Sequence, residues 1–113
     1  MRIFEYLGLL RSFERRHLPF LRSREDCDLV IAIGAHQERG TPLTLKQLYG
    51  LNIGSMATLQ RRLSRLKRLG VVVHRRSPRD GRNMELELSP RTSKIFQRYA
   101  TLVASGQAAS GKG

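Results

Sequence analysis

Arginine side chains dominate the chemistry that this chain could perform, and they are concentrated in one acid-free segment. Between Arg39 and Arg79 the sequence contains no Asp or Glu, but it contains ten basic residues. Arg and Lys bind phosphates through charge-assisted hydrogen bonds, and Arg also reads base edges through paired hydrogen bonds. A folded surface ordinarily mixes both signs of charge, because unmixed charge repels itself. The segment therefore predicts a surface that meets an external polyanion.

The whole chain shares this bias. It carries 21 Lys and Arg residues against 9 Asp and Glu residues, for a formal net charge of +12. This charge makes nucleic acid the first expected class of partner and an anionic membrane surface the second. The 113 residues, 40% of them hydrophobic, suit one packed domain. No apolar run approaches the roughly 18 residues of a spanning helix, and the first residues do not read as a signal peptide. We expect a cytoplasmic, nucleoid-associated protein that does not enter the membrane.

Few residues could support catalysis or metal binding. His17, His36 and His74 are scattered, and no Cys/His spacing resembles a zinc site. Cys27 is the single cysteine, and its acidic neighbours disfavour the thiolate, so we expect it to pack rather than react. No nucleophile–base arrangement is evident. We expect no enzyme activity, no cofactor and no metal.

Two predicted helices carry most of the acid-free segment. Thr44 to Gln47 reads T-x-x-Q, a capping box that begins a short helix. After a glycine-containing turn, Ser55 can cap a second helix that ends at about Leu69, before Gly70. Two helices joined in this way predict a helix-turn-helix.

The second of these helices separates leucines from arginines at about 100° per residue. Met56, Leu59, Leu63 and Leu66 share one face, which we expect to pack inward. The opposite face is small and polar at its start and arginine-rich further along. It comprises Ala57, Thr58, Arg61, Arg65 and Arg68, with Arg62 on the flank. Such a face is typical of a recognition helix, which enters the major groove and contacts bases and phosphates.

A β-hairpin is predicted after Gly70. Residues 71–76 are β-branched and then basic, and residues 77–82 are rich in turn formers. Residues 84–88 alternate strictly, which indicates a half-buried strand with its acids outward. The hairpin therefore has a basic tip.

Helices are also predicted on both sides of this region. One covers residues 2–16, and another runs from about residue 24 to residue 38 with Ser23 as its cap. The last runs from about Pro90 to about Val103. Residues 105–113 have the composition of a disordered tail.

The order helix, turn, helix, strand, basic loop, strand is that of a winged helix-turn-helix. Over about residues 43–89 the sequence resembles the MarR-type transcriptional regulators. The marks along the second helix and its stop are Thr58, Arg61, Arg65, Leu66 and Gly70. The marks in the hairpin are Asp80, Gly81 and Arg82, which form the D-x-R wing, and then Leu86, Leu88 and Ser89, which form the closing L-x-L-[ST] strand.

The resemblance implies a mainly α fold with a small β-hairpin (α+β), built as a three-helix core plus wing with flanking helices in one domain over residues 1–104. It implies a sequence-specific regulator that binds double-stranded DNA, with residues 55–69 in the major groove and residues 71–88 on the adjacent minor groove or backbone. A homodimer would form through the N- and C-terminal helices. The effector, if any, is left open.

The resemblance also assigns roles to residues. Thr58 and Arg61 would face the major groove, and Arg65 would lie nearer the phosphates. Arg82 would reach the minor groove or its backbone, oriented in part by Asp80. Arg79 is added on charge and position alone. The full predicted DNA-binding set is Ser55, Thr58, Arg61, Arg62, Arg65, Arg68, Arg75, Arg79, Asp80 and Arg82.

Two alternatives remain open. A winged-helix module could serve a replication, plasmid-maintenance or RNA-associated assembly without sequence-specific DNA binding. The apolar face of residues 2–16 could lie on a membrane surface, although dimerisation or packing on the last helix is the better expectation because the basic residues concentrate elsewhere.

Overall fold

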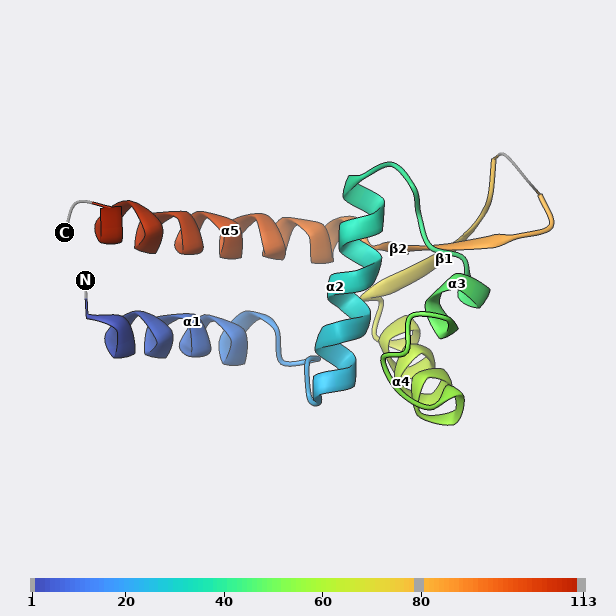
Figure 1. The fold of residues 1–113 in the computed structure, drawn as a ribbon, viewed down its shortest axis with the longest axis horizontal. Helices are drawn as coiled ribbons and strands as arrows, with labels where there is room; N and C mark the ends of the chain where they lie inside the picture. Colours follow the sequence, from blue (N-terminus) through green and yellow to red (C-terminus); the bar gives the residue numbers. More distant parts are fainter. Residues whose placement is uncertain (1, 79–80, 112–113) are drawn as a thin grey trace. The chain divides into compact units, whose positions relative to one another are not determined.

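The computed structural model describes residues 2–78 and 81–111, with residues 107–111 described by their backbone alone. Its elements are α1 (Ile3–His17), α2 (Arg24–Glu38), α3 (Leu45–Tyr49), α4 (Met56–Arg68), β1 (Val72–Arg76), β2 (Met84–Leu88) and α5 (Pro90–Gly111) (Figure 1). No helix in the described part is long and apolar enough to cross a membrane. The chain divides into two compact units, and each is described by itself. The winged-helix unit is Phe20–Pro90, and the helical-pair unit is Met1–Pro19 with Arg91–Gly113.

Local caps set the helix starts in the winged-helix unit, as predicted. Ser23 and Asp26 form a reciprocal capping box at α2, and Thr44 and Gln47 form another at α3. The Ser55 hydroxyl accepts a hydrogen bond of 3.2 Å from the Thr58 amide at the start of α4. Each contact spans three residues, so the sequence alone contains both partners.

Backbone geometry ends α4 and turns the chain before it. Gly70 adopts φ 73°, and the amide of Val71 donates to the Leu66 carbonyl at 2.9 Å. This left-handed glycine with its wrapped-back hydrogen bond is a Schellman motif. Asn52, at φ 62°, provides the left-handed residue in the turn between α3 and α4.

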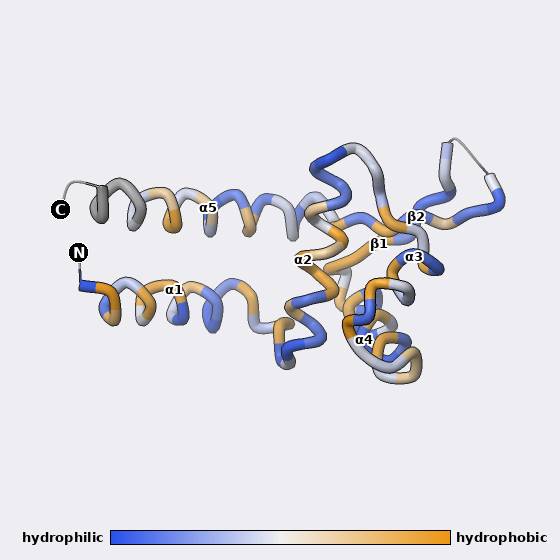
Figure 2. The backbone as a smooth tube through the Cα atoms, viewed as in Figure 1, coloured by the Kyte–Doolittle hydropathy of each residue, from blue (hydrophilic) through white to orange (hydrophobic). Residues whose placement is uncertain are grey.

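Leucine and other aliphatic side chains form the core of this unit. Figure 2 shows hydrophobic residues recurring along α2, α4 and β1. The largest buried aliphatic side chains are Leu29, Val30, Ile33, Leu48, Leu59, Leu63, Leu66, Val72 and Leu86. The predicted inward face of α4 is thus confirmed for its three leucines. It is wrong for Met56, which is 59% exposed because the first turn of α4 extends beyond the core.

The hairpin pairs antiparallel in the register Val72↔Leu88 to Arg76↔Met84. A third extended segment joins its outer edge, because the Leu86 amide donates to the Leu43 carbonyl at 2.8 Å and Thr44 forms a bridge with Glu85. Glu85 is consequently only 9% exposed. The prediction that the acids of β2 face outward is therefore wrong for Glu85, since sequence periodicity does not reveal this extra segment.

The helical-pair unit consists of α1 and α5 packed side by side. The Tyr6 hydroxyl donates to the Val103 carbonyl at 3.0 Å, and the Tyr99 hydroxyl donates to Glu14 at 3.0 Å. These contacts pair the start of α1 with the later part of α5, so the two helices run antiparallel. A Cβ atom at Gly106 would overlap the ring of Tyr6, so glycine permits this close approach.

Helix α5 extends past its predicted end at Val103 and continues to Gly111. The tail expected over residues 105–113 is therefore helical as far as residue 111, and residues 112–113 lie outside the described residues. The segment includes Ala108 and Ala109, and alanine is the strongest helix former. The glycine and serine content led us to expect disorder instead.

Candidate nucleic-acid interface

The exposed face of α4 carries the candidate interface. A shallow depression on this face is lined by Ala57, Gln60, Arg61, Ser64 and Arg68. The small side chains of Ala57 and Ser64 leave space between the longer ones, and both arginines are exposed. Gln60 and Ser64 are additions to the predicted set. Their helical spacing from Ala57 could have identified them, because residues three, four and seven apart share a face.

The first turn of α4 carries no acidic residue of its own. The nearest acid comes from α2, whose Glu25 side chain lies beside Gly54, just before the Ser55 cap. The Ser55 hydroxyl donates to the Thr58 hydroxyl at 3.0 Å, and the Arg61 guanidinium lies 3.5 Å from the same Thr58 oxygen. The structure thus brings Ser55, Thr58 and Arg61 together in one small polar cluster at the start of α4.

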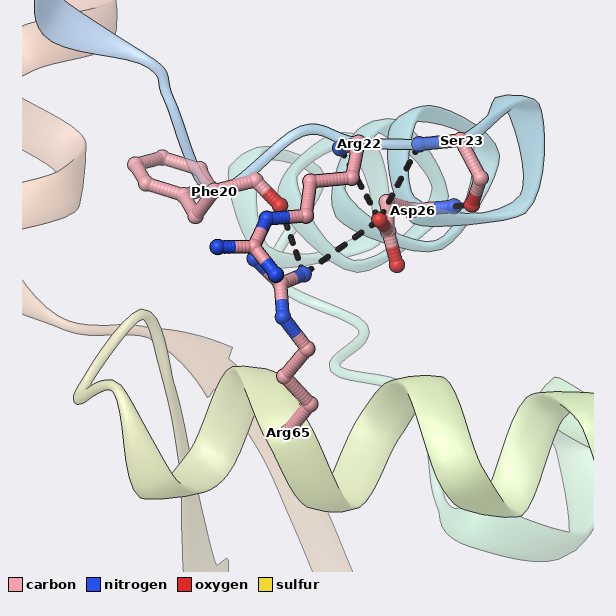
Figure 3. Close-up of polar contacts among 5 residues, drawn as sticks. All are labelled: Phe20, Arg22, Ser23, Asp26 and Arg65. Carbon is pink, nitrogen blue, oxygen red and sulfur yellow. Dashed lines mark hydrogen bonds and ion pairs between the residues drawn. The ribbon is translucent and has the colours of Figure 1, made fainter.

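Arg65 points away from this surface, toward α2 (Figure 3). Its Nη1 donates to the Phe20 carbonyl at 2.8 Å and lies 3.4 Å from Asp26 Oδ2. The Arg65 side chain is 16% exposed, and the Asp26 side chain is 0% exposed. Arg65 therefore connects α4 to the chain segment that leads into α2, whereas the resemblance implied a place near the phosphates.

The same Asp26 oxygen gathers several donors. It accepts hydrogen bonds from the backbone amides of Arg22 at 3.0 Å and Ser23 at 3.1 Å. The other oxygen, Oδ1, is buried and has no hydrogen-bond partner among the described residues. A buried carboxylate needs such donors and an opposite charge, because transfer of an unpaired charge from water is costly. Arg65 supplies that charge.

The two described site residues of the hairpin, Arg75 and Arg82, lie in different surroundings. Arg75 Nη2 pairs with Glu87 Oε1 on the neighbouring strand at 2.7 Å, and the Arg75 side chain is 58% exposed. His74 contacts Lys67 of α4, so strand alternation directs Arg75 to the opposite face of the hairpin. Arg82 is exposed near the turn.

Two predicted members of the site, Arg79 and Asp80, lie outside the described residues. The remaining predicted member, Arg62, is half-buried on the flank of α4.

His74 has an unusual environment beneath α4. Its Nδ1 lies 3.4 Å from Lys67 Nζ, and its Nε2 is buried without a hydrogen-bond partner among the described residues. Burial lowers the pKa of His74, and the positive charge of Lys67 lowers it further. The imidazole is thereby favoured in its neutral form, in which Nδ1 can accept a hydrogen bond from the ammonium group.

Solved structures with the same fold include two structures of MepR and one of MarR, both winged-helix proteins. S. aureus MepR bound to ethidium bromide matches with a TM-score of 0.68 at 13% identity, over 99% of this chain and 81% of that chain. The S. aureus MepR–DNA complex matches with a TM-score of 0.68 at 16% identity, over 90% of this chain and 75% of that chain. MarR matches with a TM-score of 0.57 at 17% identity, over 99% and 82%. No family model and no curated protein sequence matches the chain. The predicted α+β winged-helix architecture, and with it the resemblance to MarR-type proteins, is confirmed as a likeness of fold.

Proposed function

We propose that this protein is a transcriptional regulator that binds double-stranded DNA in a sequence-specific manner. Helix α4 enters the major groove, and the β1–β2 hairpin contacts the adjacent minor groove or backbone. The observation that carries the proposal is the exposed face of α4, which has small side chains, a first turn without acidic residues, and flanking arginines. A major groove admits a helix of this kind, because its start contacts base edges while its arginines bind bases or phosphates.

The fold supports the same proposal. The S. aureus MepR–DNA complex has this fold, so the fold is compatible with binding to a duplex. At 16% identity the likeness extends to the fold, and the residue roles must come from this chain's own surface. Here that surface carries Arg61 and Arg68 of α4.

Residue roles follow from exposure and partners. Arg61 stands beside Thr58 at the start of the helix, so this pair is proposed to read bases, and Ser55 is proposed to accompany them as the cap. Arg68 and Arg62 are proposed to contact phosphates further along α4. Five predicted residues need separate treatment: Arg82, Arg79 and Asp80 remain proposed for the wing, whereas Arg65 and Arg75 are engaged by Asp26 and Glu87 and are assigned positioning roles.

The helical-pair unit is proposed to form a homodimer. Helix α1 exposes large apolar side chains, among them Ile3 at 57%, Phe4 at 83% and Leu7 at 44%. These three residues are spaced to share one helix face, and such apolar surface favours association. A two-fold dimer would present two α4 helices to successive major grooves, about one helical turn apart, on a palindromic site. The protein would act at the nucleoid, in the cytoplasm.

Selection of bound sites from random DNA, with measurement of the oligomer mass, tests this proposal. A palindromic consensus and a dimer mass are the expected results. Binding that is no tighter to the selected site than to random duplex, over a range of salt concentrations, would contradict it. That outcome would favour an interaction module that does not read sequence.

A further inference from the structure

A cleft in the winged-helix unit has a different chemical character from the basic surface. It lies between the end of α2, the start of α3 and the hairpin face that carries Arg75. Its ionisable lining residues are His36, Arg75, Glu85 and Glu87. Pro42, Leu43 and Leu51 contribute apolar lining. Two of the nine acids of this strongly basic chain are thus gathered in one recess.

Glu85 is the unusual member of this group. It is only 9% exposed, and no hydrogen bond or ion pair engages its carboxylate within residues 2–78 and 81–111. Arg75 stands directly opposite Glu85 in the strand register, yet the Arg75 guanidinium pairs with Glu87 at 2.7 Å. Arg75 therefore neutralises one acid, and the Arg75–Glu85–Glu87 group retains a single negative charge.

The two glutamine side chains that line the cleft are already engaged. The Gln47 side-chain oxygen accepts from the Thr44 amide at 3.0 Å, and the Gln37 side-chain oxygen accepts from the Leu88 amide at 2.8 Å. Glu85 is thus the acceptor that a ligand would meet. The Glu85 side chain is largely covered, but neither of its carboxylate oxygens is among the buried unpaired atoms of the described residues, so the carboxylate is open to the cleft. A recessed carboxylate that no positive side chain pairs with is available to a cation that enters the cleft.

We propose that this cleft binds a small organic cation, an ammonium or amidinium group on a compact apolar body, with Glu85 as its ion-pair partner. The cationic group would supply hydrogen-bond donors and a positive charge to Glu85, and the apolar body would contact Pro42 and Leu51. Strand alternation places this hairpin face opposite the one that contacts α4, and its carboxylates would repel phosphate, so the site is distinct from the proposed DNA surface. The proposal does not depend on DNA binding.

Isothermal titration of the full chain with benzamidine hydrochloride, at pH 8 and without DNA, tests the proposal. Benzamidinium carries the cation on a small ring, and benzamide is its neutral counterpart of similar shape. We expect benzamidinium to bind with Kd on the order of 1 mM, a realistic affinity for so small a ligand. Benzamide should bind at least about tenfold more weakly, because charge-assisted hydrogen bonds are the stronger class.

Two variants make the test specific to Glu85. E85Q should weaken benzamidinium binding about tenfold or more, because it removes the charge while keeping the shape. E38Q should bind as the wild type does, because Glu38 is an exposed carboxylate next to the lining residue Gln37 but does not line the cleft. Circular dichroism spectra would establish that both variants are folded, and amide shifts at Thr44 and Gln37 would locate the ligand.

Four results would overturn the proposal. The first two are absence of benzamidinium binding up to about 20 mM, which is well above the expected Kd, and equal affinity for benzamide. The other two are wild-type affinity for benzamidinium in E85Q, and a loss of affinity in E38Q equal to that in E85Q. Failure of the DNA-site selection would leave this result unaffected, so the two proposals fail separately.

Discussion

Replacement of Arg65 by methionine tests whether this arginine is a structural connection or a phosphate contact. R65M keeps the length and much of the apolar volume of the side chain while it removes the charge and all five N–H donors. The variant leaves Asp26 buried with a negative charge and leaves the Phe20 carbonyl without this donor. Both losses occur inside the winged-helix unit.

The contacts set the expected magnitude. Removing one partner of a buried ion pair costs about 3–5 kcal/mol. Asp26 keeps two backbone donors, at 3.0 and 3.1 Å, and Arg65 is 16% exposed, so the cost should lie below that range. We expect the free energy of unfolding to fall by about 2–3 kcal/mol, as for loss of a charged hydrogen bond.

Denaturation in urea, followed by circular dichroism, measures this change, and hydrogen exchange at α4 amides assigns it to the winged-helix unit. In a D26N background the same R65M change should cost only about 1 kcal/mol, because no buried charge is left unpaired. R61M is the matched control on the same helix, and its effect should stay within about 0.5 kcal/mol, since Arg61 is exposed.

DNA binding supplies the result that would refute the reasoning. Loss of one phosphate contact lowers the slope of log K against log salt by about 1. If Arg65 is internal, folded R65M should keep the wild-type slope. An unchanged stability together with a slope reduced by about 1 would show that Arg65 contacts phosphate.

Three further outcomes are expected. Arg61→Ala should cost about 1–3 kcal/mol of specific binding and relax preference at one base position; an equal loss on specific and random duplexes, by fluorescence titration, would contradict base reading. Arg82→Ala should weaken binding to all sequences similarly and lower the salt slope by about 1; a loss confined to one sequence would argue against a backbone role. The pKa of His74 is lowered in the folded state. As the pH falls below about 6.5, the ordinary histidine value, the unfolded state therefore binds more protons than the folded state. The free energy of unfolding should decrease as the pH falls through that value toward the folded-state pKa. His74→Gln should reduce this pH dependence in urea denaturation, and an identical pH profile would refute it.

Local signals in the sequence predicted the elements well. The starts of α2, α3 and α4 depend on Ser23, Thr44 and Ser55, which contact backbone amides three residues away. Gly70 ends α4 for an equally local reason, because glycine tolerates φ 73°. Both partners of such an interaction lie close together in the sequence, so a short stretch of sequence contains them. The spacing of the leucines also predicted which face of α4 packs inward.

Long-range partners account for the differences. Arg65 shares its helix face with Arg61 and Arg68 in the sequence pattern, yet it turns toward Asp26, which lies 39 positions earlier in the chain. Glu85 and Glu87 look alike in an alternating strand, but Arg75 pairs with one of them while the segment at Thr44 covers the other.

Periodicity therefore accounts for which residues share a face, because that follows from the repeat of the backbone alone. Whether a charge on that face meets solvent or a buried partner depends on side chains distant in the sequence, and folding alone brings these together. The basic surface was predicted from the sequence pattern of the acid-free segment. The three-dimensional packing turned Arg65 toward Asp26 and paired Arg75 with Glu87. Among the described residues it left the covered Glu85 side chain without an ion-pair partner.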